Sequence, residues 1–485
     1  MMTPTTGWGT TTTLYGEGVA RERLVVIGGD AAGMSAASGA RRRKTVDELE
    51  IVAFERGNYT SYAACGLPYF VADVVDAIDD LIARHPDEFR DNQDIDVHMR
   101  HEVVSIDLDR RRVTVRDLEA NAERDEPFDQ LVIATGAVPR RPALERSDAA
   151  GIFGIQTVTD GAALRDYIVE QKPKNAVVVG GGYIGLEMAE AMKRRGLAVT
   201  IVDSGPQVMS TLDPDMGAMV GDAIRGLGCE VHTGTRVQAF ETDSDSHVKA
   251  VVSDQGTYAA DLVVLGLGVL PDVALAQAAG ITIGITGAIA TDRRMATNVA
   301  GVWSAGDCVE TYHRVARRPV NIALGTHANK QGRAIGVNAT GGHLTFPGVI
   351  GTAVTKICEL EVARTGLTER EATAAGFEYV TATIESTTRA SYYPGASPIT
   401  VKVLAERGTG RLIGAQIIGR EGAAKRVDVM AAAIWNEMTA EEFASLDLGY
   451  APPFSPVWDP TLIAARRVDA AAAVSADDAR ARSLP

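Results

Sequence analysis

Cysteine is scarce in this sequence. Four cysteines occur among 485 residues, and they stand far apart, at Cys65, Cys229, Cys308 and Cys358. So small and scattered a set builds no disulfide framework and has no metal-ligand spacing, so we expect no metal site. Unpaired thiols of this kind fit a reducing cytoplasm.

Two further absences concern membranes and basic charge. No run of eighteen apolar residues occurs, and residues 1–20, rich in Thr and Gly, lack the apolar segment and basic start of a signal peptide. We therefore expect no membrane span and a cytoplasmic location. The 48 basic residues are outnumbered by 63 acidic ones, which gives a formal net charge of −15. This balance argues against nucleic acid or an anionic membrane as the main partner.

Glycine, by contrast, is abundant, with 49 residues, and its first cluster indicates a nucleotide site. Residues 24–27 (Leu-Val-Val-Ile) predict a buried parallel strand, and residues 28–33 (Gly-Gly-Asp-Ala-Ala-Gly) follow directly. Such a turn directs a helix N-terminus at a diphosphate, although Asp30 replaces the middle glycine of G-x-G-x-x-G. Glu55 lies 22 residues beyond Gly33, near the spacing of a carboxylate that binds a ribose hydroxyl. The predicted cofactor contacts here are Gly28, Asp30, Ala31, Gly33 and Glu55.

A second glycine turn matches the dinucleotide motif fully. Gly180, Gly182 and Gly185 follow a predicted strand, and the next strand ends at Asp203. A carboxylate there accepts from a ribose 2′-hydroxyl and repels a 2′-phosphate, and residues 204–206 supply no compensating Arg, so NADH is favoured over NADPH. Two dinucleotide sites in one chain are explained economically by a bound flavin and a visiting nicotinamide.

Two more segments complete a family resemblance. Residues 131–137 (Leu-Val-Ile-Ala-Thr-Gly-Ala) contain Thr135 and Gly136, and residues 302–307 (Val-Trp-Ser-Ala-Gly-Asp) end at Asp307. Together with the glycine turns they resemble the FAD-dependent pyridine nucleotide-disulfide oxidoreductase family, over roughly residues 22 to 465. The resemblance implies bound FAD, with Thr135, Gly136 and Asp307 among its contacts and Asp307 at the ribityl–phosphate region.

The resemblance also implies the architecture. We expect an α/β fold with two Rossmann-like domains, one for FAD and one for NAD, and a C-terminal α+β interface domain. The predicted domains are a discontinuous FAD domain at 21–149 and 271–345, an NAD(P)H domain at 150–270 and a dimerisation domain at 346–467. Disordered tails are predicted at 1–20 and 468–485.

The stretch around Cys65 carries the predicted chemistry. Gly66 and Pro68 are typical of a helix start, so the helix dipole should lower the pKa of the thiol below about 8.5. The alternative is an inert buried cysteine. Thr60 and Phe70 stand five residues to either side, so no resolving cysteine of a two-cysteine member is present.

Residues 61–69 instead resemble the single-cysteine branch, which contains coenzyme A-disulfide reductases, NADH oxidases and persulfide or polysulfide reductases. Two C-terminal segments agree, beginning at Tyr392 and at Tyr450. The resemblance implies that these tyrosines reach the sulfur pocket of a partner subunit, in an obligate homodimer, where either would protonate a departing thiolate. The alternative is that the tyrosines only pad an interface.

The substrate is less closely specified. Ser35, Arg42 and Ser61 are candidates to hold the adenosine phosphate and pantetheine arm of coenzyme A, although the basic run containing Arg42 equally suits a solvated helix end. Ala31 stands where the oxidases carry a His, which favours sulfur chemistry. Ala64 and Trp458 depart from the coenzyme A-disulfide reductase pattern. His327 and Lys330 are assigned to packing, and Cys308 to a structural role.

The predicted function is NAD(P)H-dependent reduction of coenzyme A disulfide, or of a related small disulfide or persulfide, through Cys65. The resting thiol would carry coenzyme A as a mixed disulfide or be a sulfenate. The alternatives are an NADH oxidase that reduces O2 through a sulfenate, a polysulfide or persulfide reductase, and a flavin-bearing redox sensor.

Overall fold

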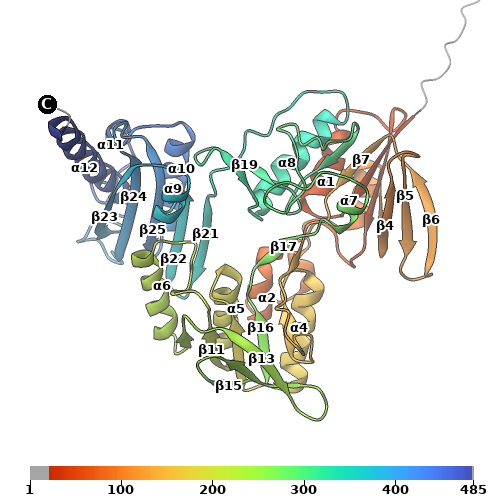
Figure 1. Cartoon of the computed structure of the whole chain (residues 1–485), viewed down its shortest axis with the longest axis horizontal. Coiled ribbons are helices and arrows are strands. Elements are labelled where there is room, and N and C mark those ends of the chain that lie inside the picture. Colours follow the sequence, from red (N-terminus) through yellow and green to blue (C-terminus); the bar gives the residue numbers. More distant parts are fainter. Residues whose placement is uncertain (1–20, 483–485) are drawn as a thin grey trace, which may run out of the picture.

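The structure is a computed structural model that describes residues 21–482, with side chains described as far as residue 473. The predicted tail at 1–20 lies outside the described residues. Three units are visible in Figure 1: an N-terminal α/β unit, a second α/β unit below it, and a C-terminal unit that carries the last helix.

The N-terminal unit contains a five-stranded parallel sheet in the order β18-β7-β1-β2-β3. Its strand β1 is the predicted apolar run, buried from Leu24 onward between two neighbouring strands. The bounds are β1 (Glu22–Ile27), β2 (Leu49–Glu55), β3 (Ile95–Met99), β7 (Gln130–Ile133) and β18 (Val302–Ser304). Strand β18 joins this sheet although almost 170 residues separate it from β7, because the second unit lies between them in sequence.

Two helices with small residues pack tightly against each other on this sheet. They are α1 (Ala31–Arg41) and α8 (Gly325–Asn338). A Cβ on Gly336 would lie 2.7 Å from the Ala36 carbonyl oxygen, so the close approach depends on glycine. The remaining elements of this unit are α3 (Pro86–Gln93), α7 (Ala274–Ala278), a meander of β4 (His101–Asp107), β5 (Arg112–Asp117) and β6 (Ala122–Pro127), and a hairpin of β19 (Thr311–His313) and β20 (Arg318–Val320).

The second unit repeats this plan. Its parallel sheet has the order β12-β11-β10-β16-β9, and a Gly-rich turn again leads from a buried strand into a helix. The strands are β9 (Ile152–Gly154), β10 (Asn175–Val179), β11 (Ala198–Val202), β12 (Glu230–His232) and β16 (Leu262–Leu265). The helices are α4 (Val158–Gln171), α5 (Tyr183–Arg194) and α6 (Pro214–Gly226), and a meander contains β13 (Val237–Thr242), β14 (Val248–Ser253) and β15 (Thr257–Ala259).

The chain enters and leaves the second unit through one antiparallel pair, β8 (Ala137–Pro139) and β17 (Val269–Pro271). The two crossings therefore run side by side. The exact limits at 149/150, 270/271 and 345/346 stay predictions.

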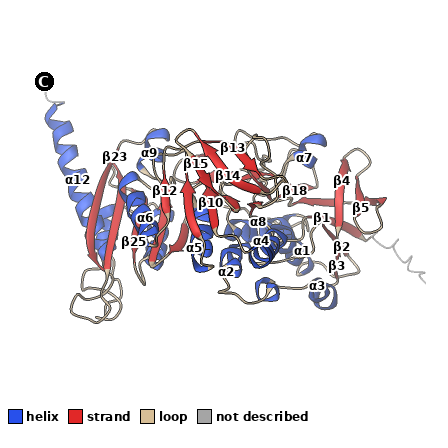
Figure 2. Ribbon diagram, turned by 90° about the horizontal axis from the view of Figure 1, so that it is seen from below, coloured by secondary structure: helices blue, strands red, loops and turns tan. Residues whose placement is uncertain are grey.

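The C-terminal unit is an antiparallel sheet in the order β21-β22-β25-β24-β23, with helices packed against it (Figure 2). The strands are β21 (Ala353–Ile357), β22 (Leu360–Gly366), β23 (Tyr379–Thr387), β24 (Pro398–Glu406) and β25 (Leu412–Gly419). The helices are α9 (Glu369–Ala374), α10 (Val427–Trp435), α11 (Ala440–Ala444) and α12 (Pro460–Arg482).

Helix α12 corrects the disorder predicted for residues 468–485 as far as Arg482, and residues 483–485 lie outside the described residues. The chain is helical as far as Arg482, and Val468 is fully buried against the C-terminal unit. The stretch is rich in Ala, which has the highest helix propensity, and the helix packs on β23 and β24. The composition of this stretch suggested a disordered tail. Its helix propensity and its packing on the C-terminal sheet instead continue helix α12.

Among the described residues, no helix combines the length and hydropathy needed to span a bilayer. The same residues contain no group of three or more His, Cys, Asp or Glu side chains arranged to hold a metal ion.

A buried ion cluster joins the second unit to the C-terminal unit. The Nζ of Lys402 on β24 lies 2.8 Å from Asp215, 3.3 Å from Asp213 and 2.5 Å from Glu369. Lys402 and Asp213 are almost completely buried, and Gln416 donates a further hydrogen bond of 2.6 Å to Asp213. No other cation of the described residues lies within ion-pair distance of the Asp213 carboxylate. Lys402 therefore supplies the positive charge that compensates this buried carboxylate at the contact between the two units.

Replacing Lys402 with Met should lower the stability of this contact strongly. Removing one partner of a buried pair leaves an uncompensated charge, which costs about 3–5 kcal/mol. Urea unfolding would measure the loss. Lys425→Met is the matched control, because Lys425 pairs with Asp428 at the exposed surface and should cost less than about 1 kcal/mol. Equal losses in the two variants would contradict the role given to Lys402.

Candidate functional site

The first glycine turn has the geometry that its sequence predicts. Gly28 has a φ of +101°, and a Cβ there would overlap the carbonyl oxygen of Ala134. A Cβ on Gly33 would overlap the carbonyl oxygen of Gly28 in the same way. Helix α1 then begins at Ala31, with Asp30 as N-cap residue. Only glycine fits the tight turn, which leaves the helix N-terminus accessible to a phosphate.

The predicted ribose-binding carboxylates are held in the same way in both units. Glu55 accepts hydrogen bonds of 2.7 Å from the backbone N–H groups of Gly29 and Gly57. Asp203 accepts bonds of 2.6 Å from the N–H groups of Gly181 and Gly205. Each carboxylate is therefore fixed beside its glycine turn, and carboxylate oxygens have further lone pairs for ribose hydroxyls.

Two more carboxyl groups face the first turn. Burial is the main cause that raises the pKa of Asp30 to about 6, and repulsion from Glu55 and Asp307 adds to the rise. Burial also raises the pKa of Asp307, whose carboxylate accepts no hydrogen bond from any described residue. Gly136, with a φ of +71°, leaves open space beside it. The half-buried Asp307 carboxylate, an acceptor without a donor among the described residues, suits a hydroxyl of a ribityl chain, so the residues present fit FAD.

The predicted thiol lies at the surface. Cys65 is in the short 3₁₀ helix η1 (Ala64–Gly66), directly before α2 (Leu67–Val71), and it is the one exposed cysteine of the four. Thr60 and Phe70, the two positions where a resolving cysteine would stand, are both buried.

The predicted direction of the Cys65 pKa is wrong. Partial burial, followed by repulsion from Glu187 and Asp307, raises the pKa of the thiol above its ordinary value. Helix α2 has only five residues, so its dipole is weak, and the two carboxylates oppose it. Anything that neutralises these carboxylates would make the thiolate easier to form.

The sequence analysis did not single out Glu187, whose charge contributes to the raised pKa of Cys65. It lies on α5, one turn after Tyr183, and its carboxylate accepts a hydrogen bond of 2.5 Å from the Thr355 hydroxyl on β21. Burial raises the pKa of Glu187. The available signal was its position two residues after the last glycine of the second turn, on the helix face four residues from Tyr183.

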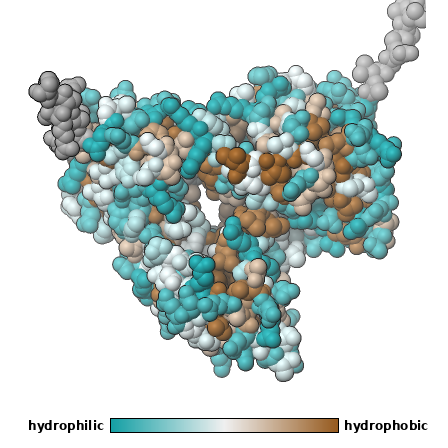
Figure 3. Space-filling model, viewed as in Figure 1, coloured by the Kyte–Doolittle hydropathy of each residue, from teal (hydrophilic) through white to brown (hydrophobic). Residues whose placement is uncertain are grey.

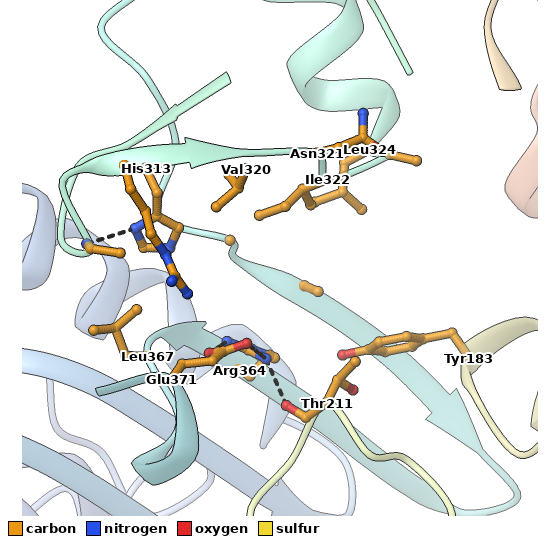
Figure 4. A pocket seen from close by; sticks show the side chains of 15 residues that line it. Tyr183, Thr211, His313, Val320, Asn321, Ile322, Leu324, Arg364, Leu367 and Glu371 are labelled. Atoms are coloured by element: carbon orange, nitrogen blue, oxygen red, sulfur yellow. Dashed lines mark hydrogen bonds and ion pairs between the residues drawn. The ribbon is translucent and has the colours of Figure 1, made fainter. Parts of the chain in front are cut away.

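A cavity of about 420 Å³ opens beside Tyr183 where the three units meet (Figure 4). The space-filling view shows a hollow there with hydrophobic residues around it (Figure 3). Arg364 and Glu371 lie at one end and form a 2.6 Å ion pair, and Arg364 also donates to the Thr211 carbonyl at 2.6 Å. Burial lowers the pKa of the neighbouring His313 to about 4, so this imidazole is neutral near pH 7. Gly182, just before Tyr183, has open space where a Cβ would stand, so the residues fit a nicotinamide dinucleotide.

The two predicted tyrosines are brought together, but away from Cys65 of the same chain. Tyr392 and Tyr450 are exposed on the C-terminal unit, and the interaction with the Tyr392 hydroxyl raises the pKa of Tyr450. No hydrogen bond joins either tyrosine to Cys65 within the described chain. Phe454 and Trp458 are exposed on the same unit.

The predicted substrate residues all belong to the N-terminal unit. Ser35 on α1 donates a 2.8 Å hydrogen bond to Asn329 on α8, and Arg42 caps the end of α1 with an exposed side chain. Ser61 has a φ of +50° and its N–H donates to the Gly29 carbonyl. Lys330, expected to pack, is instead exposed on α8. Cys308 is fully buried.

Comparison with known proteins decides the family. The model of the pyridine nucleotide-disulphide oxidoreductases matches residues 22–332, and that of their dimerisation domain matches residues 352–460. The chain belongs to this family. It is an NAD(P)H-dependent flavoprotein oxidoreductase of the disulfide and persulfide class, and the predicted fold class and the cofactors FAD and NAD(P)H are confirmed.

Three relatives are particularly informative. The chain is 39% identical over 449 residues to the NAD(P)H coenzyme A polysulfide/persulfide reductase of Pyrococcus horikoshii, covering 92% of this chain and 98% of that protein. It is 35% identical over 444 residues to an NADH oxidase of Methanocaldococcus jannaschii, covering 91% and 98%. The solved NAD-dependent persulfide reductase from A. fulgidus superposes with a TM-score of 0.88 at 39% identity, covering 92% of this chain and 82% of that one.

Proposed function

We propose that this enzyme uses Cys65 as its single reacting sulfur and reduces a persulfide or disulfide of coenzyme A with NADH. The observation that carries the proposal is the exposure of Cys65, which no other cysteine of the chain shares, beside a nucleotide site and two carboxylates. The buried Thr60 and Phe70 leave no position for a second sulfur in the motif.

A basic surface on α1 and α8 supports coenzyme A as the carrier of the substrate sulfur. Arg42 and Arg43 at the end of α1, and Lys330 and Arg333 on α8, are exposed and form no ion pair with any described residue. Lys330 and Arg333 are three residues apart and so share a helix face. In a chain of net charge −15, such a cluster favours a phosphorylated ligand. The name of the Pyrococcus horikoshii relative includes coenzyme A.

The reaction at Cys65 is a thiol–disulfide exchange. The Cys65 thiolate attacks one sulfur of R–S–S–R, a Cys65–S–S–R bond forms, and the other sulfur leaves as a thiolate that takes up a proton. With a persulfide R–S–SH, attack on the outer sulfur releases R–SH and leaves the extra sulfur on Cys65. FAD, when bound, relays two electrons from NAD(P)H to reduce the adduct on Cys65.

The exposed tyrosines fit a site completed by a second copy of the chain. Tyr392 and Tyr450 lie together on the dimerisation domain, and in a homodimer each pair would enter the sulfur pocket of the partner. A phenol of raised pKa stays protonated near neutral pH, so it would donate a proton to the departing thiolate.

A charge-removal experiment tests the choice of coenzyme A. Replacing Arg42 and Arg333 together with Ala should raise the KM for coenzyme A disulfide and coenzyme A persulfide by about tenfold per arginine, because each loses a charge-assisted hydrogen bond to phosphate. The KM for hydroxyethyl disulfide, which carries no phosphate, should not change. Arg110→Ala, on the exposed turn between β4 and β5, is the matched control.

Two results would contradict the proposal. One is an unchanged KM for the coenzyme A substrates in the double variant. The other is oxygen consumption with NADH alone that exceeds every sulfur-dependent rate, which would favour the oxidase function of the Methanocaldococcus jannaschii relative.

A further inference from the structure

Strand β21 of the C-terminal unit lies along helix α5 of the nucleotide unit. Its residues alternate, with Thr355 and Ile357 buried and Val354 and Lys356 exposed. On the buried side, Thr355 donates to Glu187 at 2.5 Å. Just beyond the strand, the N–H of Cys358 donates to Glu190 on the next turn of α5 at 2.8 Å. Ala353, at the start of the strand, lines the cavity beside Tyr183.

This arrangement gives Glu187 one polar partner. The Thr355 hydroxyl is the only hydrogen-bond donor that reaches its carboxylate from the described residues, and no cation lies within ion-pair distance of it. The charged and titratable groups around it are Glu190 and Tyr183 on α5, Cys65 in η1 and Tyr69 on α2. The charge of Arg194 on α5 opposes the rise in the pKa of Tyr69. The charge of Asp307, in the loop after β18, adds to the rise in the pKa of Cys65.

We propose that Thr355 is a positioning residue for the sulfur reaction: its hydroxyl keeps the Glu187 carboxylate ionised and in place, and ionised Glu187 sets the protonation of Cys65. The residue comes from the dimerisation domain, so contact between that domain and α5 tunes a thiol on a third unit. The inference rests on Cys65 being the reacting sulfur, and it does not depend on the identity of the substrate.

The electrostatics agree with this geometry. Burial raises the pKa of Glu187 and the bond from Thr355 opposes that rise. Partial burial raises the pKa of Cys65, and Glu187 is the next largest cause, ahead of Asp307. Removing the Thr355 hydroxyl should therefore raise the pKa of Glu187, leave more of it neutral near pH 7, and lower the pKa of Cys65.

The test follows Cys65 directly. In the FAD-loaded enzyme without NADH, the rate of iodoacetamide alkylation of the Cys65 peptide is measured by mass spectrometry as a function of pH. Thr355→Val should move the midpoint of this profile to lower pH by roughly half a unit or more. Thr355→Ser, which keeps the hydroxyl, should restore the original midpoint.

Three comparisons separate positioning from a general loss of structure. Glu187→Gln should lower the midpoint as well, and adding Thr355→Val to that variant should have no further effect. Thr352→Val is the matched control, because the Thr352 hydroxyl bonds Thr365 at 2.8 Å and does not bond Glu187. An unchanged profile in Thr355→Val, or a shift that persists in the Glu187→Gln background, would overturn the proposal. Neither result would bear on whether coenzyme A is the substrate.

Discussion

Cys65→Ser should abolish NADH-dependent reduction of coenzyme A disulfide and coenzyme A persulfide, with a loss of roughly 10³-fold or more in kcat. A serine hydroxyl is almost entirely protonated at neutral pH and forms no exchangeable bond to sulfur, so neither attack nor adduct formation remains. Steady-state oxidation of NADH at saturating sulfur substrate measures the loss. The fall should be in kcat, because the basic surface on α1 and α8 that would bind the substrate is untouched.

Cys358→Ser is the matched control for this variant. Cys358 is half-buried on the turn between β21 and β22, burial raises the pKa of its thiol to about 11, and its contact with Glu190 is made by the backbone N–H. It should retain nearly full activity. If the Cys65 variant kept full turnover toward every sulfur acceptor, the reaction at sulfur would have to be assigned elsewhere.

The combined substitution Asp203→Ala and Ser204→Arg should reverse the preference for NADH over NADPH that we expect of the enzyme. The carboxylate of Asp203 is fixed by two backbone N–H groups at the end of β11, where it accepts from a ribose 2′-hydroxyl and repels a 2′-phosphate. Losing one charged hydrogen bond costs about 1.5–3 kcal/mol, so kcat/KM for NADH should fall roughly 10- to 100-fold. An arginine beside the site should raise kcat/KM for NADPH by a similar factor.

The single variant Ser204→Arg separates the two effects. With Asp203 still present, repulsion of the 2′-phosphate persists, and the preference for NADH should be largely kept. The FAD content should stay the same in both variants, because Asp203 lies in the second nucleotide unit. A wild-type enzyme that used NADPH more efficiently than NADH would contradict the assignment of Asp203.

The glycine turns and the two ribose-binding carboxylates could be predicted from the sequence, because each is specified by residues that lie close together in the chain. Gly28 and Gly180 follow apolar strands, and Glu55 and Asp203 stand at the spacing that a strand–turn–helix unit requires. The structure holds both carboxylates by equivalent pairs of N–H groups. A turn within one βαβ unit depends on residues close in sequence, so the sequence alone specifies it.

The rest depends on contacts between residues far apart in the chain. Glu187 and Thr355 are 168 residues apart, and no pattern in either segment indicates that they meet. The pKa of Cys65 was predicted from a local helix start, whereas partial burial, and after it Glu187 on another unit and Asp307 from a distant loop, raise that pKa. The pairing of Tyr392 with Tyr450 likewise follows from the folded C-terminal unit.

The disorder predicted for the residues of helix α12 was wrong for a different reason, because the sequence of this segment itself favours a helix. The Ala-rich stretch after Val468 has high helix propensity, but its composition resembled a disordered end. The burial of Val468 and Ala472 shows that the helix is also held by packing on the sheet.

Mass spectrometry of the Cys65 peptide tests the central claim most directly. The FAD-loaded enzyme is incubated with coenzyme A disulfide, quenched at low pH, digested without reductant and compared with a sample that then received NADH. The account predicts a coenzyme A adduct on Cys65 alone, which disappears after NADH is added. An enzyme that turns over coenzyme A disulfide while Cys65 stays unmodified throughout would contradict it.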